Sequence, residues 1–131
     1  MTGRYSFAKD RRVRSKADFS SVFEKGVKQS RGPLTALAIA TDHPTSRLGL
    51  SVPKRVGTAP RRNRIKRLLR ESFRLMQHDF PRPYDLVIVV RPHEPLILAE
   101  YQRILNALMV KLHQAWKEKH GDERQDAKTP S

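Results

Sequence analysis

The strongest periodicity in the sequence lies near its middle, where apolar or small side chains recur three and four residues apart. The positions of this stripe are Ile65, Leu68, Leu69, Ser72, Phe73 and Met76. Their spacing predicts a surface helix from about residue 59 to residue 77, packed along one side. Thr58 fits the N-cap of this helix, and Pro60 is tolerated in its first turn. At about 100° per residue, the opposite face carries polar and mostly cationic residues. They are Asn63, Lys66, Arg67, Arg70 and Arg74.

Two further helices are predicted from the same kind of spacing. A short helix is expected over residues 16–25, with Ser15 as its N-cap and Gly26 as its stop. A longer helix is expected from about residue 98 to residue 117. The apolar stripe of the longer helix is Tyr101, Ile104, Leu105, Leu108, Leu112 and Trp116.

Three segments are predicted to be strands: residues 34–40, 47–52 and 84–90. In the second, Leu48 and Leu50 alternate with small residues, so one face is apolar and the face of Gly49 and Ser51 is bare. The turn at 42–46 suggests that the first two strands form an antiparallel hairpin. The unbroken apolar run of the third predicts an interior strand covered on both faces.

The element order α-β-β-α-β-α predicts a single-domain α+β sandwich, with helices packed on a small mixed sheet. If the second and third strands are parallel, the helix between them forms a split β-α-β crossover, which the general rule expects to be right-handed. Residues 1–14 are expected to be a basic arm, 15–118 the folded domain and 119–131 a disordered polar tail.

Charge narrows the choice of partner. The 131 residues include 27 Lys and Arg against 13 Asp and Glu, a formal net charge of +14. Such a surplus indicates a polyanionic partner, above all a nucleic acid. The longest apolar run is too short to span a bilayer, no signal sequence is visible, and the apolar faces fit a core. We therefore expect a cytoplasmic protein with no membrane partner. Without cysteine, disulfides and thiolate sites are excluded.

The positive charge is concentrated between residues 54 and 74, where nine basic residues face one acid. A merely solvated helix face is the alternative, but such faces usually mix both signs at i, i+4 spacing. Arginine predominates, which suits bidentate contacts to phosphate. The predicted RNA-binding residues are Lys54, Arg55, Arg61, Arg62, Asn63, Arg64, Lys66, Arg67, Arg70 and Arg74.

Phe19 and Phe23 lie one helical turn apart and have two interpretations. They can pack in the core, or they can stack on unpaired bases at the rim of a shallow cleft. The second interpretation requires the bare face of Gly49 and Ser51 to lie beside them.

Nothing in the sequence predicts a catalytic or metal-binding residue. The acids are scattered, no glycine-rich phosphate loop is present, and the histidines lack metal-ligand spacing. A paired-histidine ribonuclease remains an alternative that spacing alone does not remove. The histidines are His43, His78, His93, His113 and His120.

Three segments together resemble the bacterial ribonuclease P protein subunit. Residues 62–74, Arg-Asn-Arg-Ile-Lys-Arg-Leu-Leu-Arg-Glu-Ser-Phe-Arg, are similar to the signature helix of that family. Residues 48–57 resemble the strand and loop before the signature helix, and residues 15–26 resemble the first helix of the family. The likeness runs from about Val13 to Trp116 in the same element order.

The resemblance implies a protein cofactor of a catalytic RNA, in a complex that removes the 5′ leader from precursor tRNA. The arginine helix and its preceding loop would bind the RNA, and Phe19, Phe23 and Ser51 would line a cleft for the single-stranded leader. It also implies a left-handed crossover, one protein per RNA, and Mg²⁺ held mainly by the RNA and substrate phosphates.

Two departures from the family pattern stand out. Strand 34–40 has no aromatic residue facing the cleft, only Ala36, Ala38 and Ala40, and Pro53 and Thr58 replace a small residue and an asparagine. The rival hypotheses are a ribosomal or RNA-chaperone protein, a DNA-binding protein and a stand-alone nuclease.

Overall fold

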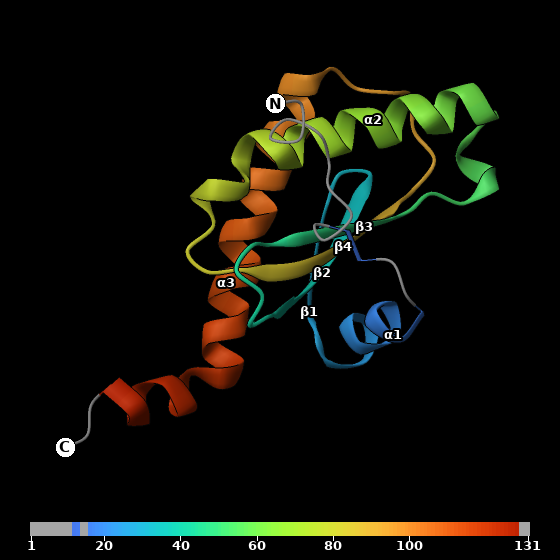
Figure 1. The fold of residues 1–131 in the computed structure, drawn as a ribbon. Coiled ribbons are helices and arrows are strands. Elements are labelled where there is room, and N and C mark those ends of the chain that lie inside the picture. Colours follow the sequence, from blue (N-terminus) through green and yellow to red (C-terminus); the bar gives the residue numbers. More distant parts are fainter. Residues whose placement is uncertain (1–11, 14–15, 129–131) are drawn as a thin grey trace.

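The computed structural model describes residues 12–13 and 16–128, and for residues 121–128 it describes the backbone alone. In chain order the elements are α1 (Lys16–Lys25), β1 (Val27–Arg31), β2 (Leu34–Ala40), β3 (Arg47–Ser51), the 3₁₀ turn η3 (Lys54–Val56), α2 (Ala59–Met76), the 3₁₀ turn η4 (Gln77–Asp79), β4 (Tyr84–Val90) and α3 (Leu98–Lys128) (Figure 1). No helix in these ranges is long and apolar enough to cross a membrane.

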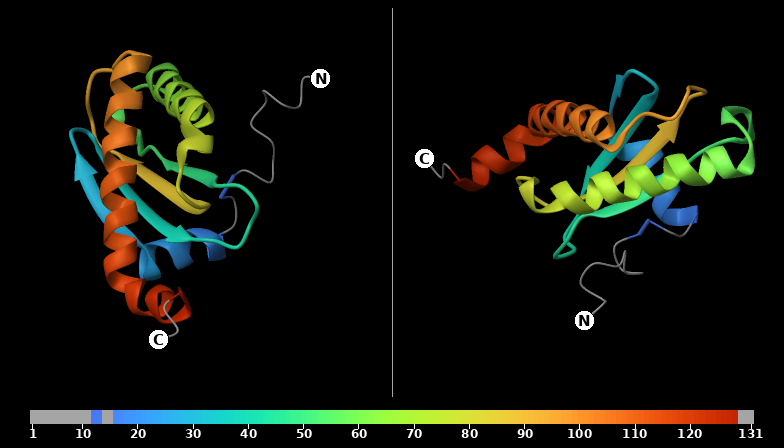
Figure 2. Two further views of the ribbon diagram at one scale, coloured as in Figure 1. Left: turned by 90° about the vertical axis from the view of Figure 1, so that its left-hand side faces the viewer. Right: turned by 90° about the horizontal axis from the view of Figure 1, so that it is seen from above.

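The strands form one mixed sheet in the order β1-β2-β4-β3. β2 is antiparallel to both of its neighbours, and β3 is parallel to β4. Helices α2 and α3 cover one face of the sheet, and α1 lies on the other (Figures 1 and 2). The expected α+β sandwich is therefore confirmed, and β4 is the interior strand that its apolar run predicted.

The predicted hairpin between strands 34–40 and 47–52 is wrong, because β4 lies between them and pairs with both. β4 is the most apolar strand, so the central place buries both of its faces. Since β3 and β4 are direct neighbours, the β-α-β unit through α2 is not split. Its crossover is left-handed (Figure 2), as the resemblance implies and against the general rule.

The sequence prediction also missed strand β1. No strand was predicted between Gly26 and residue 34, but the Gly32-Pro33 pair forms the two-residue turn of a β1–β2 hairpin, in which Arg31 pairs with Leu34. Gly32 has φ of 59°. A hairpin turn that begins with a positive φ favours glycine, which has no side chain to clash there.

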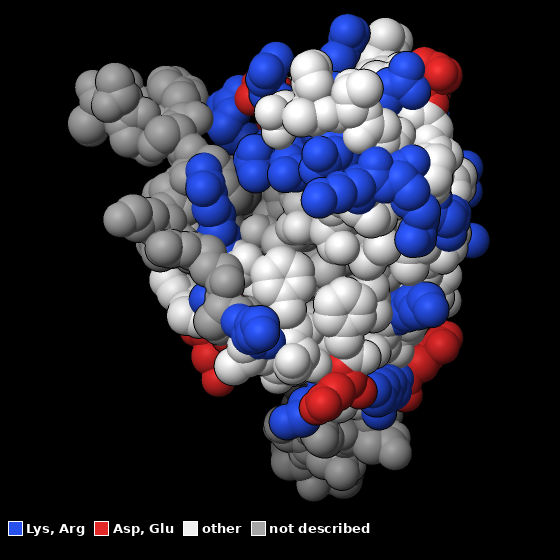
Figure 3. All heavy atoms as spheres, turned by 90° about the vertical axis from the view of Figure 1, so that its right-hand side faces the viewer, with Lys and Arg blue, Asp and Glu red and all other residues white. Residues whose placement is uncertain are grey.

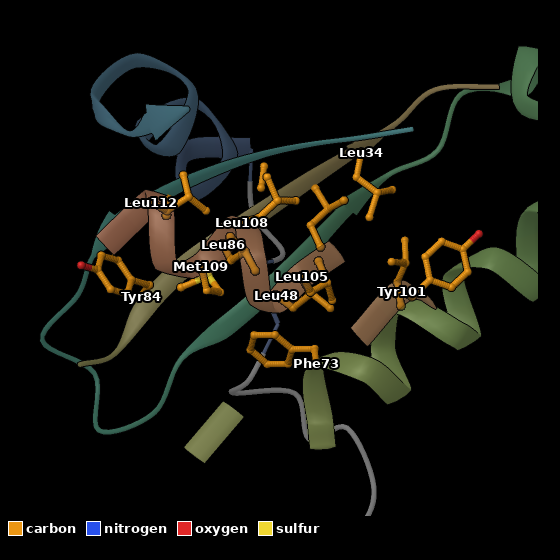
Figure 4. Close-up of a cluster of buried hydrophobic side chains, with 14 of the residues drawn as sticks. Leu34, Leu48, Phe73, Tyr84, Leu86, Tyr101, Leu105, Leu108, Met109 and Leu112 are labelled. Atoms are coloured by element: carbon orange, nitrogen blue, oxygen red, sulfur yellow. The ribbon is translucent and has the colours of Figure 1, made fainter. Parts of the chain in front are cut away.

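The larger core lies between the sheet and the pair α2 and α3. The α2 stripe is confirmed: five of its six positions are buried, and Leu68 packs partly buried against this core. Figure 4 shows Phe73 of α2 and Leu105 of α3 directed toward the strands. The start of α2 is also as predicted, since the Thr58 hydroxyl accepts a hydrogen bond from the Arg61 N–H at 3.3 Å.

A smaller core lies under α1 on the other face and contains Val13, Val22, Leu37 and Val87. Val13 belongs to the segment that was expected to be a loose arm. Its N–H donates to the Leu48 carbonyl at 3.0 Å. Residues 12–13, the described end of the arm, therefore lie along the edge of β3. Burial of the Val13 side chain holds them there. Residues 1–11 and 14–15, including the proposed N-cap, lie outside the described residues.

Helix α3 extends into the segment from residue 119 that is predicted to be a disordered tail, and the disorder of that tail stays a prediction. α3 continues to Lys128 past non-helical backbone angles at His120, where φ is −119°. The His120 ring stacks on Trp116 with 3.8 Å between ring centroids. Beyond the break the sequence is rich in Glu, Arg, Gln, Ala and Lys, which are good helix formers even without an apolar stripe.

One ion pair joins two strands of the sheet to α1. The Arg47 guanidinium of β3 donates two hydrogen bonds to the Asp85 carboxylate of β4, at 2.8 and 2.6 Å. Asp18 of α1 lies 3.7 Å from the same guanidinium. The hydrogen bonds that Arg47 donates to Asp85 raise the pKa of Arg47 above its ordinary value, against the effect of burial. This pair therefore fixes α1 over the sheet.

Replacing Asp85 with Asn should destabilise the protein strongly, because the half-buried Arg47 would lose its close counter-charge. We expect the free energy of unfolding to fall by about 3 kcal/mol. Denaturant unfolding would measure this loss. The matched control is Asp42→Asn at an exposed position, for which we expect the free energy of unfolding to change by less than about 0.5 kcal/mol. Equal small losses in both variants would contradict this role for the pair.

Candidate nucleic-acid interface

The cations of α2 lie on different sides of the helix. Arg62, Lys66 and Arg70 recur every four residues and are all half-buried, and we call them the inner row. They lie on the flank of the helix toward Arg12 at the edge of β3, since Arg12 acts electrostatically on Arg70. The Arg62 Nε donates to the Gly57 carbonyl at 3.1 Å, so the first cation of the row is held in place.

A second row, Asn63, Arg67 and Arg74, points away from the core; we call it the outer row. Asn63 and Arg67 are exposed. Arg74 instead donates to Glu71 one turn earlier, at 3.0 Å through its Nε. This hydrogen bond lowers the pKa of the Glu71 carboxyl below its ordinary value. The single acid of the segment thus neutralises Arg74, and Arg67 is the outer cation best placed for an external anion.

Two of the predicted RNA-binding arginines face the third side of the helix, toward the start of α3. Arg61 forms an ion pair with Glu94, with 3.4 Å between nitrogen and oxygen. Arg64 lies close enough to Tyr101 to lower its pKa, although burial raises that pKa overall. Exposed ion pairs of this kind contribute little to stability. The sequence did not indicate this division, because Glu94 is distant along the chain.

Lys54 and Arg55 extend the cationic surface beyond the N-terminal end of α2. Both are exposed on the turn η3, and the buried Val56 holds that turn against the larger core. Figure 3 shows Lys and Arg side chains gathered in a band across one face of the molecule, with acidic side chains only toward its margins.

Arg12 was not among the predicted site residues, and the structure brings it to the inner row. Burial lowers the pKa of Arg70, and the nearby positive charge of Arg12 lowers it further. The half-buried guanidinium of Arg70 near the exposed Arg12 raises the free energy of the unbound protein, because like charges repel. A phosphate between them would offset that repulsion. The apolar Val13 beside Arg12 is a signal in the sequence that this end of the arm is anchored, and the structure buries it.

An uncharged surface adjoins the band on the α1 side of the sheet. Gly49 and Ser51 of β3 face this side, as predicted. A Cβ atom added to Gly49 would lie only 2.8 Å from the Phe19 ring, so the bare backbone there receives that ring. Phe19 packs against the smaller core, whereas 48% of Phe23 is exposed. The structure therefore supports core packing for much of Phe19 and a surface role for Phe23.

The alanines of strand β2 do not face this surface, contrary to expectation. Ala36 and Ala38 belong to the larger core under α2 and α3, and Leu37 is the β2 residue that belongs to the smaller core on the α1 side. The β1–β2 hairpin sets this alternation, because side chains of a strand point to opposite faces in turn. Leu37 is thus the buried β2 residue on the α1 side, where the family pattern implies an aromatic ring.

The described residues contain no group of three or more His, Asp or Glu side chains that could hold a metal ion. Two of the histidines bind buried tyrosines instead. His93 is 2.7 Å from the Tyr101 hydroxyl, and His113 is 2.7 Å from the Tyr84 hydroxyl. Both pairs connect α3 to its surroundings, His113 to Tyr84 of β4 and Tyr101 to His93 of the preceding loop.

Comparison with known proteins identifies the family of this chain. The family model described as Ribonuclease P matches residues 7–116. This chain belongs to the ribonuclease P protein family. Membership implies partnership with the RNA of ribonuclease P, in a complex whose endonuclease activity processes tRNA.

Solved ribonuclease P proteins have the same fold. A Staphylococcus aureus RNase P protein mutant with defective mRNA degradation activity is 26% identical, with a TM-score of 0.70 over 81% of this chain and 90% of its own. The Thermotoga maritima RNase P protein in complex with 1-(4-fluorophenyl)-2-thiourea is 29% identical, with a TM-score of 0.69. The match covers 75% of this chain and 96% of the Thermotoga protein. The roles of individual residues stay predictions of the sequence and the geometry.

Replacing Arg67 with Ala should weaken binding to a bacterial ribonuclease P RNA by about tenfold. The slope of the logarithm of the binding constant against the logarithm of the salt concentration should become shallower by about one unit, because one phosphate contact is lost. The matched control is Arg103→Ala on α3, where the exposed arginine is already paired with Glu100 at 2.7 Å. Filter binding at several salt concentrations would measure both. An unchanged slope for Arg67→Ala would remove Arg67 from the phosphate contacts.

Proposed function

We propose that this chain is the RNA-binding protein subunit of ribonuclease P and holds two different forms of RNA on adjoining surfaces. The cations of α2 and η3 bind the phosphates of the folded catalytic RNA. The uncharged surface of Phe23, Phe19 and Ser51 binds the single-stranded 5′ leader of precursor tRNA. The observation that carries the proposal is that the inner row borders this surface at Arg12 and the edge of β3.

Each surface fits its RNA for a physical reason. Structured RNA presents phosphates at fixed spacing, and the rows of a packed helix present guanidinium groups at fixed spacing in return. Unpaired bases instead need a flat apolar partner. Phe23 offers an exposed ring, and the partly buried Phe19 lies one turn earlier in α1. A strand of RNA that leaves the cationic rows would therefore meet an aromatic surface next.

In this proposal the catalytic RNA carries the chemistry. Water replaces the leader at the phosphorus that joins it to the tRNA, so that the tRNA keeps its mature 5′ end. Mg²⁺ would be held mainly by the phosphates of the RNA and the substrate, and no step uses a protein side chain as acid, base or nucleophile. The net charge of +14 would reduce the repulsion between the two RNAs. One protein would act with one RNA, in the cytoplasm.

Replacing Phe23 with Ala should lower the affinity of the reconstituted protein–RNA complex for precursor tRNA. Its affinity for mature tRNA should not change, because only the precursor has a leader. Loss of one stacked base predicts about a tenfold change in affinity. The measurement is the ratio of the two dissociation constants for the reconstituted complex. Because 48% of the Phe23 side chain is already exposed, the fold should be unaffected.

The matched control is Val110→Ala on α3, an apolar residue that is 61% exposed. This variant should leave the ratio unchanged. If Phe23→Ala weakens both tRNAs equally, Phe23 does not contact the leader. Phe19→Ala is less informative, because Phe19 fills the space over Gly49 and its removal would also disturb the smaller core.

A further inference from the structure

A cavity of about 250 Å³ lies at the C-terminal end of α2. It is formed by the loop between β2 and β3 and by the segment between α2 and β4, which lie at the same end of the sheet (Figure 2). Two hydrogen bonds join these segments: Thr41 N–H to the Pro83 carbonyl at 3.2 Å, and Tyr84 N–H to the Ser46 hydroxyl at 2.9 Å. The lining residues are Pro44, Thr45, Ser46, Gln77, His78, Phe80, Pro81, Arg82 and Pro83.

Arg82 gives this cavity an unusual polar group. Its Nε is buried and has no hydrogen-bond partner among the described residues. A guanidinium N–H that is removed from water without an acceptor is costly, so a buried one indicates an acceptor other than the described residues. None of the lining residues is acidic. The described residues therefore leave the position of this acceptor open to a ligand.

Two further side chains in the cavity can act as donors. The Ser46 hydroxyl accepts its hydrogen bond from Tyr84, which leaves its own proton for another acceptor. His78 lines the same cavity and is exposed to solvent at the mouth. An arginine together with a hydroxyl and an imidazole suits an oxyanion, and the planar guanidinium suits a phosphate in particular.

We propose that this cavity binds one phosphate of an RNA backbone, with Arg82 as the charged ligand and Ser46 and His78 as further hydrogen-bond donors. The inference rests on the proposed RNA-binding function and extends its interface. The 18 residues of α2 span about 27 Å. The cationic rows begin at the N-terminal end of that helix, and the cavity lies at the other end. An RNA that follows the helix along its length would reach Arg82 last.

The test compares Arg82→Gln, which removes the charge, with Arg82→Lys, which keeps the charge but not the planar fork. The control is Arg103→Gln on α3. The dissociation constant for a bacterial ribonuclease P RNA would be measured at several salt concentrations. We expect Arg82→Gln to weaken binding about fivefold to tenfold with a salt slope lower by about one, and Arg82→Lys to keep the slope but lose part of the affinity. Arg103→Gln should change neither. Thermal unfolding would confirm that each variant is folded.

A second arm distinguishes the source of the phosphate. Inorganic phosphate would be titrated into the isotope-labelled protein while the NMR signal of the Arg82 Nε–H is followed. We expect a saturable shift that is absent once the protein is saturated with RNA. If phosphate shifts the signal but Arg82→Gln binds RNA as well as the wild type, the cavity takes a small free phosphate and the RNA contact is overturned. If neither measurement responds, the cavity holds only water and the site is overturned.

The Arg67→Ala variant separates this inference from the function on which it rests. If Arg67→Ala weakens RNA binding and Arg82→Gln does not, the cavity contact is wrong while the proposed function stands. If the wild-type protein does not bind the RNA at all, the proposed function fails, and this inference fails with it.

Discussion

The structure depends on the packing of α2, a helix that is apolar on one side and cationic on nearly all the others. Burial of its stripe between the sheet and α3 supplies the free energy that holds like charges close together. Because the buried side fixes the rotation of the helix, each arginine acquires a defined direction. The inner row, the outer row and the pair that faces α3 follow from this one constraint.

The sheet separates the two surfaces of the protein. On its α2 side the strands provide large apolar residues, and on its α1 side Gly49 leaves space for the Phe19 ring. The Arg47–Asp85 pair, together with Asp18, fixes α1 above that side. As a result, a charged surface and an uncharged one adjoin at the edge of β3, where Arg12 and Val13 extend the sheet. Adjoining surfaces of this kind suit two forms of RNA in one complex.

The pattern of residues within single segments predicted the elements that form within single segments. The helices, the stripe of α2 and the interior position of β4 all follow from repeats within one segment, and the structure confirms them. Strand pairing depends on contacts between distant segments, which explains why the predicted hairpin was wrong. The same reason applies within the candidate site: neither the approach of Arg12 to Arg70 nor the pairing of Arg61 with Glu94 has a signature in the neighbouring sequence. The unpaired Nε of Arg82 likewise becomes visible only in three dimensions.

The central claim is that this protein assists a catalytic RNA and performs no cleavage itself. The most direct test is the cleavage of a precursor tRNA at low Mg²⁺ concentration by a bacterial ribonuclease P RNA, with the protein present, with the protein absent, and with the protein alone. The account predicts that the protein stimulates cleavage at the mature 5′ end only when the RNA is present. Cleavage by the protein alone, or no stimulation despite tight binding to the RNA, would contradict it.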